Sequence, residues 1–469
     1  MNYWFVKAMD IQKNNRKEEL GNERVGKLLF KYSVPAIVGV TASSLYNIVD
    51  TIFIGQGAGP LALSGLAVSF PVFLILIGIS ISTGVGASSV ISRALGANDD
   101  ERALRATGNA MLLIALFSLA IMILGTWFLD PVLRLFGASD SVLPYAHDYM
   151  SVISLGSFFI CFSNTGSNFA RAEGNAKVSM ASMLIGTIIN LILDPIFIFG
   201  LGWGIKGAAI ATVIATAAAS GFLLFYFFLS GRSLLHIQRS HLVIDGEISI
   251  ETTKIGFSTL SRFLMASLQG IFINNSIVYY GGDLYLAILV IVYRLYIFVT
   301  FPIYGIGMGL QPIIGFNYGA GKLQRVKESL RKAIASSVVL TSLAFLVMMI
   351  FAEQLLRLFS GNEMIIDKGQ EIMRIMIIML PLAGFYMTGF VLFQAIGKPL
   401  PALLVSLSPQ LSFLPLVLLL PMVFKLWGVW IAFPASNFFG FAFSLFLIGR
   451  EVKKLGNYQE QPEIQTAEA

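Results

Sequence analysis

Long apolar stretches recur along the whole chain, each followed by a short polar loop. An α-helix needs about 20 residues to cross roughly 30 Å of hydrocarbon, because it rises about 1.5 Å per residue. A transmembrane β-barrel would instead show alternating segments of about ten residues, so these continuous runs predict an all-α, polytopic membrane protein. We predict twelve spans: residues 29–54, 61–92, 108–129, 145–170, 178–201, 207–230, 255–281, 285–315, 333–353, 372–396, 400–424 and 428–449.

Composition and charge predict how the chain sits in the membrane. Charged residues make up 12% of the chain and its mean hydropathy is +0.78, whereas a soluble domain has about 25% charged residues. With both termini in the cytoplasm, cytoplasmic segments hold 23 Lys and Arg residues and the opposite loops hold five. This bias predicts a multi-pass plasma-membrane protein with cytoplasmic termini. It also accounts for the net charge of +6 without any role for nucleic acid.

The sequence contains an internal repeat, in which similar segments lie 223 positions apart. Three pairs of segments match in this register: GVGASSVISRALGAND (84–99) with GMGLQPIIGFNYGAGK (307–322), DPVLRLFGASD (130–140) with EQLLRLFSGNE (353–363), and FARAEGNA (169–176) with LFQAIGKP (392–399). Such self-similarity predicts two lobes of six helices each. The predicted units are an N-terminal segment 1–28, an N-lobe 29–230, a linker 231–254, a C-lobe 255–450 and a C-terminal tail 451–469.

An even number of spans in each lobe makes both lobes enter the membrane in the same direction, so the repeats are parallel. Paired lobes of this kind typically surround a central cavity that opens first to one side of the membrane and then to the other. The architecture therefore favours a carrier, although a duplicated helical bundle does not by itself establish transport.

Two acidic residues are predicted to lie deep in the membrane, Asp50 in the first span and Asp194 in the fifth. An ionised carboxylate at mid-membrane costs roughly 2.5–3.5 kcal/mol on insertion scales, so each is a functional-site candidate. Both belong to the N-lobe, where one site can contain them. Two close carboxylates in a low dielectric do not both stay ionised cheaply, so the pair would hold a proton or a cation.

The fifth span carries further polar residues on the face of Asp194. Asn190 lies four positions before this acid, and Thr187 lies three positions before Asn190. Pro195, directly after Asp194, is predicted to kink the helix and to free a carbonyl group. An alternative reading is that Asp194 merely caps this kink.

Two other spans of the N-lobe extend the polar face. Tyr46 lies one turn before Asp50, and Thr212 begins a row of hydroxyls that continues with Thr216 and Ser220. Hydroxyls in membrane helices most often bond a carbonyl of their own helix or tighten helix packing, so we interpret Thr216 and Ser220 as structural.

The C-lobe has no deep acid, but it offers polar and adaptable side chains that could line a cavity. We expect Gln269, Asn275 and Gln311 in the lining, with Met180 and Met183 from the N-lobe. Arg294 either lines the cavity or extends toward an interface, and for Arg262 and Arg374 we expect the interface.

Several stretches resemble the MATE (multidrug and toxic compound extrusion) family of exporters, specifically its DinF-like, MepA-type branch. They are SLYNIVDTIFIGQG, GVGASSVISRALGAND, INLILDPIFIFGLGWGIKGAAIATVIA and QPIIGFNYGAG. The resemblance covers about residues 25–450. The NxxxDP element, with a Thr at the eighteenth position after its Asp, is specific for that branch. The NorM-like branch carries acids in its C-terminal lobe, and this chain has none at depth there.

The resemblance implies a cation site in the N-lobe. Its matching positions here are Asp50, Asn190, Asp194 and Thr212, which would hold H+ or Na+. It also implies supporting roles for Tyr46 and Asn164, and a bend of the first helix at Pro35.

From these features we expect a secondary active antiporter that exports amphipathic organic cations in exchange for H+ or Na+, with no cofactor, as a monomer in contact with membrane lipid. One alternative is a flippase for a lipid-linked precursor. A membrane-embedded enzyme is a weaker alternative, because the sequence contains neither HExxH nor GxSxG, and it also lacks a Walker A motif. A receptor or scaffold would leave the buried acids unexplained. Two carboxylates, an amide and a hydroxyl suit either ion.

Overall fold

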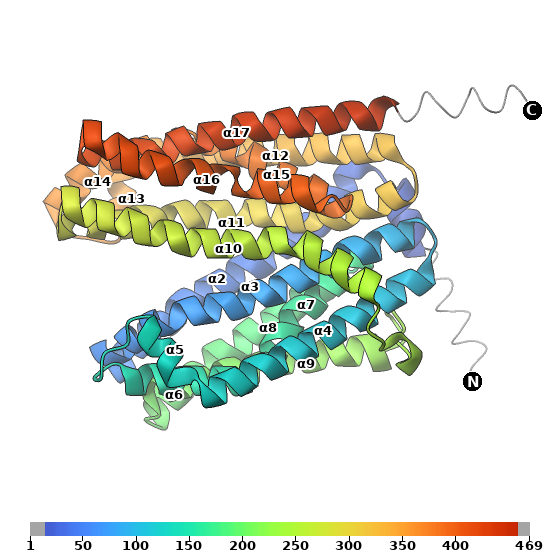
Figure 1. Cartoon of the computed structure of the whole chain (residues 1–469), viewed down its shortest axis with the longest axis horizontal. Helices are drawn as coiled ribbons and strands as arrows, with labels where there is room; N and C mark the ends of the chain where they lie inside the picture. The colour runs from blue at the N-terminus through green and yellow to red at the C-terminus, as the bar shows by residue number, and fades with distance from the viewer. Residues whose placement is uncertain (1–14, 458–469) are drawn as a thin grey trace, which may run out of the picture.

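The computed structural model describes residues 15–457, and within this range the chain is built from helices without a β-strand (Figure 1). The first half contains α2 (Val25–Ala58), α3 (Pro60–Gly96), α4 (Asp100–Trp127), α5 (Leu129–Leu135), α6 (Leu143–Leu155), α7 (Ser157–Ala172), α8 (Ala176–Pro195) and α9 (Gly204–Leu224). The second half contains α10 (Gly246–Tyr280), α11 (Asp283–Gly319), α12 (Leu323–Ile350), α13 (Ala352–Arg357), α14 (Glu363–Met376), α15 (Leu380–Ala395), α16 (Pro399–Phe424) and α17 (Leu426–Asn457).

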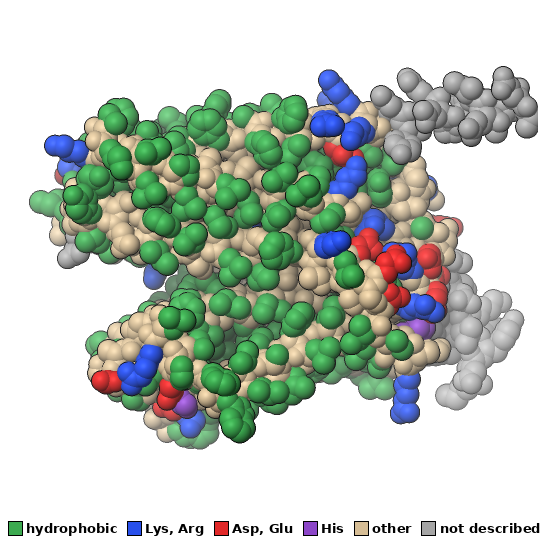
Figure 2. Space-filling view, in the orientation of Figure 1, with side chains coloured by type: hydrophobic (Ala, Val, Ile, Leu, Met, Phe, Trp, Pro, Cys, Tyr) green, Lys and Arg blue, Asp and Glu red, His purple; other side chains and the backbone are tan. Residues whose placement is uncertain are grey.

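These helices supply the twelve predicted spans, two of them broken. Among the described residues, nine helices are long and apolar enough to cross a membrane, and α14 with α15 forms a tenth span bent by 49°. The equivalent pair in the first half, α6 with α7, is interrupted at Gly156. The twelfth span is α10, which carries Glu247, Glu251 and Arg262 among its apolar residues. Hydrophobic side chains cover the flanks of the molecule, while charged ones gather at its two ends (Figure 2).

Helix boundaries repeat at the offset found in the sequence. Adding 223 to the limits of α3, α4 and α7 gives the limits of α11, α12 and α15. The backbone turns repeat as well, because positive φ angles occur in four pairs with the same spacing: Gly59 and Gly282, Asn98 and Gly321, Gly174 and Gly397, and Gly202 and Lys425. The repeat is therefore a property of the backbone as well as of the sequence.

The two halves form separate lobes that diverge toward one end. In Figure 1, α2–α9 lie below and α10–α17 lie above, and the lobes meet at the closed end, where α17 finishes. Figure 2 shows the hollow between them at the opposite end, the open end, where α5 and α13 lie. Helices extend past the predicted unit boundaries, because α10 begins at Gly246 inside the segment assigned to the linker 231–254, and α17 continues to Asn457.

At the closed end, α3 and α11 cross with their backbones in contact. A Cβ atom added at Gly96 would lie 2.0 Å from the carbonyl oxygen of Phe316, and one added at Gly319 would lie 2.0 Å from that of Arg93. These two contacts are equivalent under the repeat, since adding 223 to the numbers of Gly96 and Arg93 gives Gly319 and Phe316. The glycines of the repeated motif therefore allow the lobes to join without intervening side chains.

The helical segment 15–22 bridges the two lobes beneath this crossing. On the N-lobe side, Lys17 Nζ lies 2.8 Å from Asp100 Oδ1. On the C-lobe side, Asn317 Nδ2 donates to the carbonyl oxygen of Leu20 at 3.0 Å, and Lys322 Nζ donates to that of Gly21 at 3.0 Å. The segment thus makes polar contacts with both lobes while they are closed at this end.

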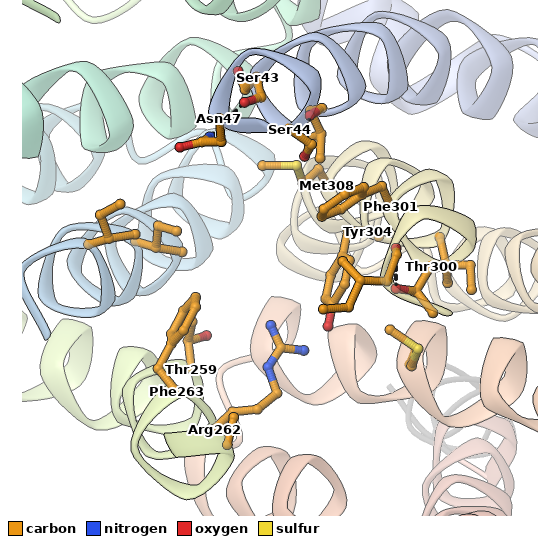
Figure 3. A pocket seen from close by; sticks show the side chains of 18 of the residues that line it. Ser43, Ser44, Asn47, Thr259, Arg262, Phe263, Thr300, Phe301, Tyr304 and Met308 are labelled. Carbon is orange, nitrogen blue, oxygen red and sulfur yellow. Dashed lines mark hydrogen bonds between the residues drawn. The ribbon is translucent and has the colours of Figure 1, made fainter. Parts of the chain in front are cut away.

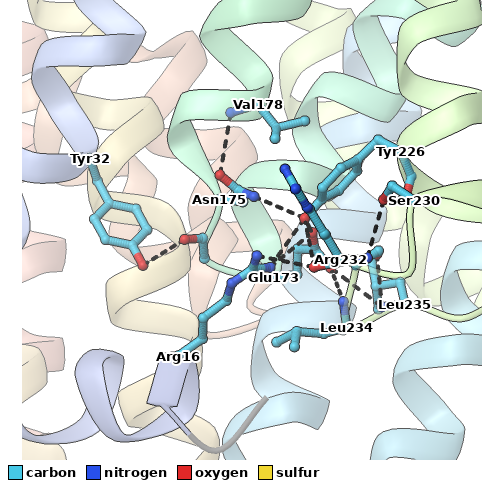
Figure 4. A network of polar contacts seen from close by, with 12 residues as sticks. Arg16, Tyr32, Glu173, Asn175, Val178, Tyr226, Ser230, Arg232, Leu234 and Leu235 are labelled. Carbon is cyan, nitrogen blue, oxygen red and sulfur yellow. Dashed lines mark hydrogen bonds and ion pairs between the residues drawn. The ribbon is translucent and has the colours of Figure 1, made fainter. Parts of the chain in front are cut away.

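A buried carboxylate holds the same segment against the N-lobe (Figure 4). Glu173, between α7 and α8, lies 3.4 Å from Arg16 Nη1 and also accepts a hydrogen bond from the Tyr226 hydroxyl. Its other oxygen accepts from Ser233 Oγ at 2.7 Å and from the Leu234 N–H at 2.6 Å. Burial raises the pKa of the Glu173 carboxyl, and Arg16, Tyr226, Ser233 and Leu234 oppose this shift.

The crossing of α3 and α11 predicts that Gly319→Ala opens the closed end. Overpacking against a backbone atom costs about 1–3 kcal/mol, which corresponds to about a 5-fold or larger change in the population of the closed arrangement. We expect faster maleimide labelling of a cysteine introduced at Ser89, which is buried at this end, in a Cys161→Ser background. Gly221→Ala, where a Cβ meets open space, should leave the rate unchanged. Equal rates in both variants would contradict the close crossing.

The Glu173 network predicts that Glu173→Ala destabilises the protein. The substitution leaves the partly buried Arg16 without its counter-charge and the Leu234 N–H without its acceptor, and a buried group that loses its partner costs about 1–3 kcal/mol. The thermal unfolding midpoint in detergent should fall by several degrees. Glu328→Ala, which removes an exposed carboxylate paired with Lys332, is the control and should have little effect. An unchanged midpoint for Glu173→Ala would show that the network contributes little.

Candidate functional site

The two deep acids of the N-lobe meet between α2 and α8. Asp50 and Asp194 are 7% and 1% exposed, and their carboxyl groups are hydrogen-bonded to each other. Two close carboxyls in a low dielectric do not both stay ionised cheaply, so this arrangement is suited to holding a proton or a cation. Sequence reasoning placed both acids in one lobe, and the structure brings them into contact.

Asn190 connects this pair to the sixth span. Its Nδ2 atom donates to Asp194 Oδ1 at 3.2 Å, one helical turn away on α8, and lies 3.4 Å from Thr212 Oγ1 on α9. Asn190 and Thr212 are 2% and 5% exposed. The four residues Asp50, Asn190, Asp194 and Thr212 therefore form one buried cluster on three helices.

Two buried oxygens of this cluster have no hydrogen-bond donor among the described residues: Asp50 Oδ1 and Asn190 Oδ1. A buried acceptor without a partner costs about 1–3 kcal/mol, so the cluster gains stability from any donor or cation that reaches both atoms. A carboxylate and an amide oxygen are hard ligands that suit a small cation, and the same carboxylate suits a proton. No group of three or more His, Cys, Asp or Glu residues with metal-binding geometry occurs in residues 15–457.

The residues expected to support the cation site differ in their relation to the two acids. Tyr46 on α2 and Tyr149 on α6 lie close enough to Asp50 and Asp194 to interact with them electrostatically. Tyr149 was not identified from the sequence, because a tyrosine near a span end carries no charge or motif that distinguishes it. Asn164 donates to the carbonyl of Ile160 on its own helix, at 2.9 Å, and belongs to the lining of the cavity described below.

Thr187 lies outside the cluster. Its hydroxyl lies 3.5 Å from Ser43 Oγ on α2, and this pair links α8 to α2. Thr216 and Ser220 donate to the carbonyl groups of Thr212 and Phe159, which agrees with their structural interpretation.

The two prolines affect their helices differently. α8 ends at Pro195, and the chain continues as a π-helical turn from Ile196 to Gly200, in which the Leu201 N–H donates to the Ile196 carbonyl at 2.9 Å. The helix is therefore widened directly after Asp194. In contrast, α2 continues unbroken through Pro35, and bending at that residue stays a prediction.

A cavity of about 1090 Å³ lies between the lobes, and both lobes supply its wall. Side chains from α2, α10 and α11 face one another across it in Figure 3. The wall is mostly apolar and includes four methionines and many aromatic rings. The methionines are Met183, Met308, Met376 and Met387, and the rings belong to Tyr46, Phe70, Phe73, Phe263, Tyr293, Tyr296, Phe301, Tyr304, Tyr386, Phe390, Phe413 and Phe433.

Four of the side chains predicted to line a cavity belong to this wall: Gln269, Arg294, Gln311 and Met183. Asn275 and Met180 are not among the lining residues. Asn275 follows Asn274, which does line the cavity, and consecutive residues of a helix point about 100° apart. Met180 lies one turn nearer the closed end than Met183, before the wall begins on that face of α8.

Arg262 also lines the cavity, which corrects the expectation that it extends toward an interface. It lies at the middle of α10, about 24 Å of helix axis from the nearer end, so its side chain does not reach beyond the helix ends. Thr259, Arg262, Ala266 and Gln269 share one face of this helix at spacings of three and four. That spacing is the sequence signal that would have placed Arg262 in the wall.

The acid pair lies behind this wall. Asn190, Thr212 and Tyr46 contribute to the lining, whereas Asp50 and Asp194 do not. A molecule in the cavity therefore contacts the amide and the hydroxyl of the cluster, and the carboxyls are one layer deeper.

Comparison with known proteins identifies relatives over nearly the whole chain. The family model MatE matches residues 35–196 and 258–419, and these two segments are again related by the offset of 223. The multidrug export proteins MepA of Staphylococcus haemolyticus and Staphylococcus aureus are each 28% identical to this chain, over 86% of it and 88% and 89% of their own lengths.

Solved structures agree in fold. The MATE multidrug transporter DinF-BH, solved in complex with a small molecule, is 38% identical, with a TM-score of 0.86 over 92% of this chain and 96% of that one. A multidrug resistance MATE family transporter of the MOP superfamily, solved in an outward-facing conformation, is 26% identical, with a TM-score of 0.88 over 93% of this chain and 98% of that one.

Proposed function

Because this chain belongs to the MatE family of multidrug transporters, we propose that it exports amphipathic organic cations in exchange for H+ or Na+. The observation that carries this proposal is the buried pair of Asp50 and Asp194 beside a large cavity between two lobes. A carboxyl pair at mid-membrane is costly, so its presence indicates a function that uses its charge.

The pair supplies a means of coupling. Adding a proton or Na+ to the cluster changes its net charge, and so changes which arrangement of the lobes is more stable. Asn190 and Thr212 transmit this change to the cavity, because they contact Asp194 or each other and also form part of the wall. Ion and drug are thus linked without direct contact between them.

The loop charges and the shape of the molecule together indicate which end faces the cytoplasm. The excess of Lys and Arg in the loops at the closed end favours the cytoplasmic side for that end. The cavity then opens to the outside, where a bound compound is released and the ion enters. Inward opening requires α3 and α11 to separate at Gly96 and Gly319, with release of the 15–22 segment.

The wall suits compounds of varied shape. Methionine side chains are unbranched and polarisable, and aromatic rings offer flat apolar surfaces, so both adapt to different hydrophobic molecules. The complex of the multidrug transporter DinF-BH with a small molecule is consistent with a ligand site in this fold. A flippase for a lipid-linked precursor is the remaining alternative, and dye export would distinguish the two.

The coupling role predicts that Asp50→Asn and Asp194→Asn each abolish export of a cationic dye, because a neutral amide neither accepts a proton nor provides a charge for Na+. Efflux from loaded cells should fall to the level of cells without the protein, with normal amounts of protein in the membrane. Asp148→Asn, which alters an exposed acid of the same lobe, should export normally. Full efflux by either deep variant would exclude its role in coupling.

The identity of the ion is tested by collapsing each gradient separately during dye efflux. The cluster offers two carboxyls, an amide and a hydroxyl, which suit either ion. We expect efflux to stop when one of the two gradients is removed and to persist when the other is removed. Efflux that persists without either gradient would contradict secondary active transport.

A further inference from the structure

The cavity wall carries positive charge and no negative charge. Among its lining residues in the described chain there is no Asp or Glu, whereas Arg171, Arg262 and Arg294 all belong to it. A compound in the cavity therefore meets arginines directly and meets the acid pair only through Asn190 and Thr212. The aromatic rings of the wall can bind organic cations through their faces, whereas the arginines suit an anionic group.

The three arginines differ in how their N–H groups are used. Arg171 is 3% exposed, and its guanidinium donates to Asn168 Oδ1 at 2.7 Å and to Ser179 Oγ, so it is engaged in packing α7 against α8. Arg294 is exposed on α11, and within residues 15–457 it has no ion pair, no hydrogen bond and no contact with the face of a ring. Arg262 has neither an ion pair nor a hydrogen bond within residues 15–457, and its guanidinium points into the cavity (Figure 3).

Aromatic rings hold the Arg262 guanidinium in place. Its Cζ atom lies 5.0 Å from the centre of the Tyr304 ring on α11 and 5.2 Å from that of Phe390 on α15. Contacts with ring faces stabilise the cation without occupying its N–H donors. Those donors lie in the plane of the group, in the fork geometry that matches a carboxylate.

We propose that Arg262, with Tyr304 and Phe390, forms a subsite for the carboxylate of an aromatic amphiphile. The subsite extends the proposed export function, on which it rests, from organic cations to zwitterions and organic acids. The carboxylate binds the guanidinium fork, and the aromatic body of the compound lies against the apolar wall. Export of such compounds then depends on Arg262, whereas export of permanent cations does not.

The experiment uses one xanthene dye in two forms: its ethyl ester, a permanent cation, and the corresponding free acid, a zwitterion. Efflux of each is measured in proteoliposomes with wild-type protein, Arg262→Gln and Arg262→Lys. A charge-assisted pair is worth roughly a factor of 10–100 in affinity, so Arg262→Gln should raise the apparent KM for the acid by about that factor. The ester should be unaffected, and Arg262→Lys, which keeps the charge but lacks the fork, should give an intermediate value for the acid.

Arg374→Gln is the matched control. It removes an exposed arginine of the same lobe that does not belong to the wall, and it should export both dyes normally. Export of the ester by Arg262→Gln shows that the variant is folded.

Two results would overturn the subsite: wild-type export of the ester without the acid, or an equal effect of Arg262→Gln on both dyes. Failure of the wild type to export either dye would instead refute the proposed function, and the subsite with it.

Discussion

The close crossing of α3 and α11 determines the shape of the molecule. Helices in a membrane gain little from burying apolar surface against each other, because lipid is equally apolar, so they associate where small residues let their backbones approach. Here Gly96 and Gly319 bring each helix against a carbonyl oxygen of the other at one end. The lobes diverge from this point, and the cavity exists because they are joined at one end and apart at the other.

The same constraint explains why the repeat is so regular. The two contacts at the crossing are equivalent, and the helices that make them, α3 and α11, have 37 residues each. An insertion in one repeat would place a side chain where the other repeat has a glycine. The chemistry of the two lobes is freer to differ, because the deep acids of the N-lobe do not take part in the crossing. One lobe accordingly carries Asp50 and Asp194, while the other carries Arg262.

Much of the fold could be predicted from the sequence, because length and hydrophobicity determine what can cross a membrane and the repeat fixes the lobes. The contact between Asn190 and Asp194 was also predictable, since these residues are one helical turn apart, whereas Thr212 was assigned to the cluster from the family resemblance. The breaks at Gly156 and near Ile377 were not predicted, because continuous apolar composition does not distinguish a straight span from a bent one. The expectation that the Arg262 side chain extends to an interface was wrong, because it considered only the distance of this residue from the end of the span. The face that Arg262 shares with Thr259, Ala266 and Gln269 was not considered. Asn274 and Asn275 point about 100° apart around the helix axis. A span predicted from hydrophobicity does not define which face of the helix points to the cavity, so the sequence could not distinguish these two residues.

The position of the acids behind the wall restricts how ion and substrate influence each other. Direct competition for a carboxylate would make a substrate's charge decisive, and neutral or anionic compounds would then be excluded. In the proposed mechanism Asn190 and Thr212 lie between them, so a substrate would change the hydrogen bonding of the amide and hydroxyl, and an ion would change the charge that these groups face on the other side. Asn190 Oδ1 has no donor among the described residues, so it is available to either. A wall that carries arginine and a proposed coupling site that carries carboxyls are therefore compatible in one transporter, because two neutral residues, Asn190 and Thr212, lie between them.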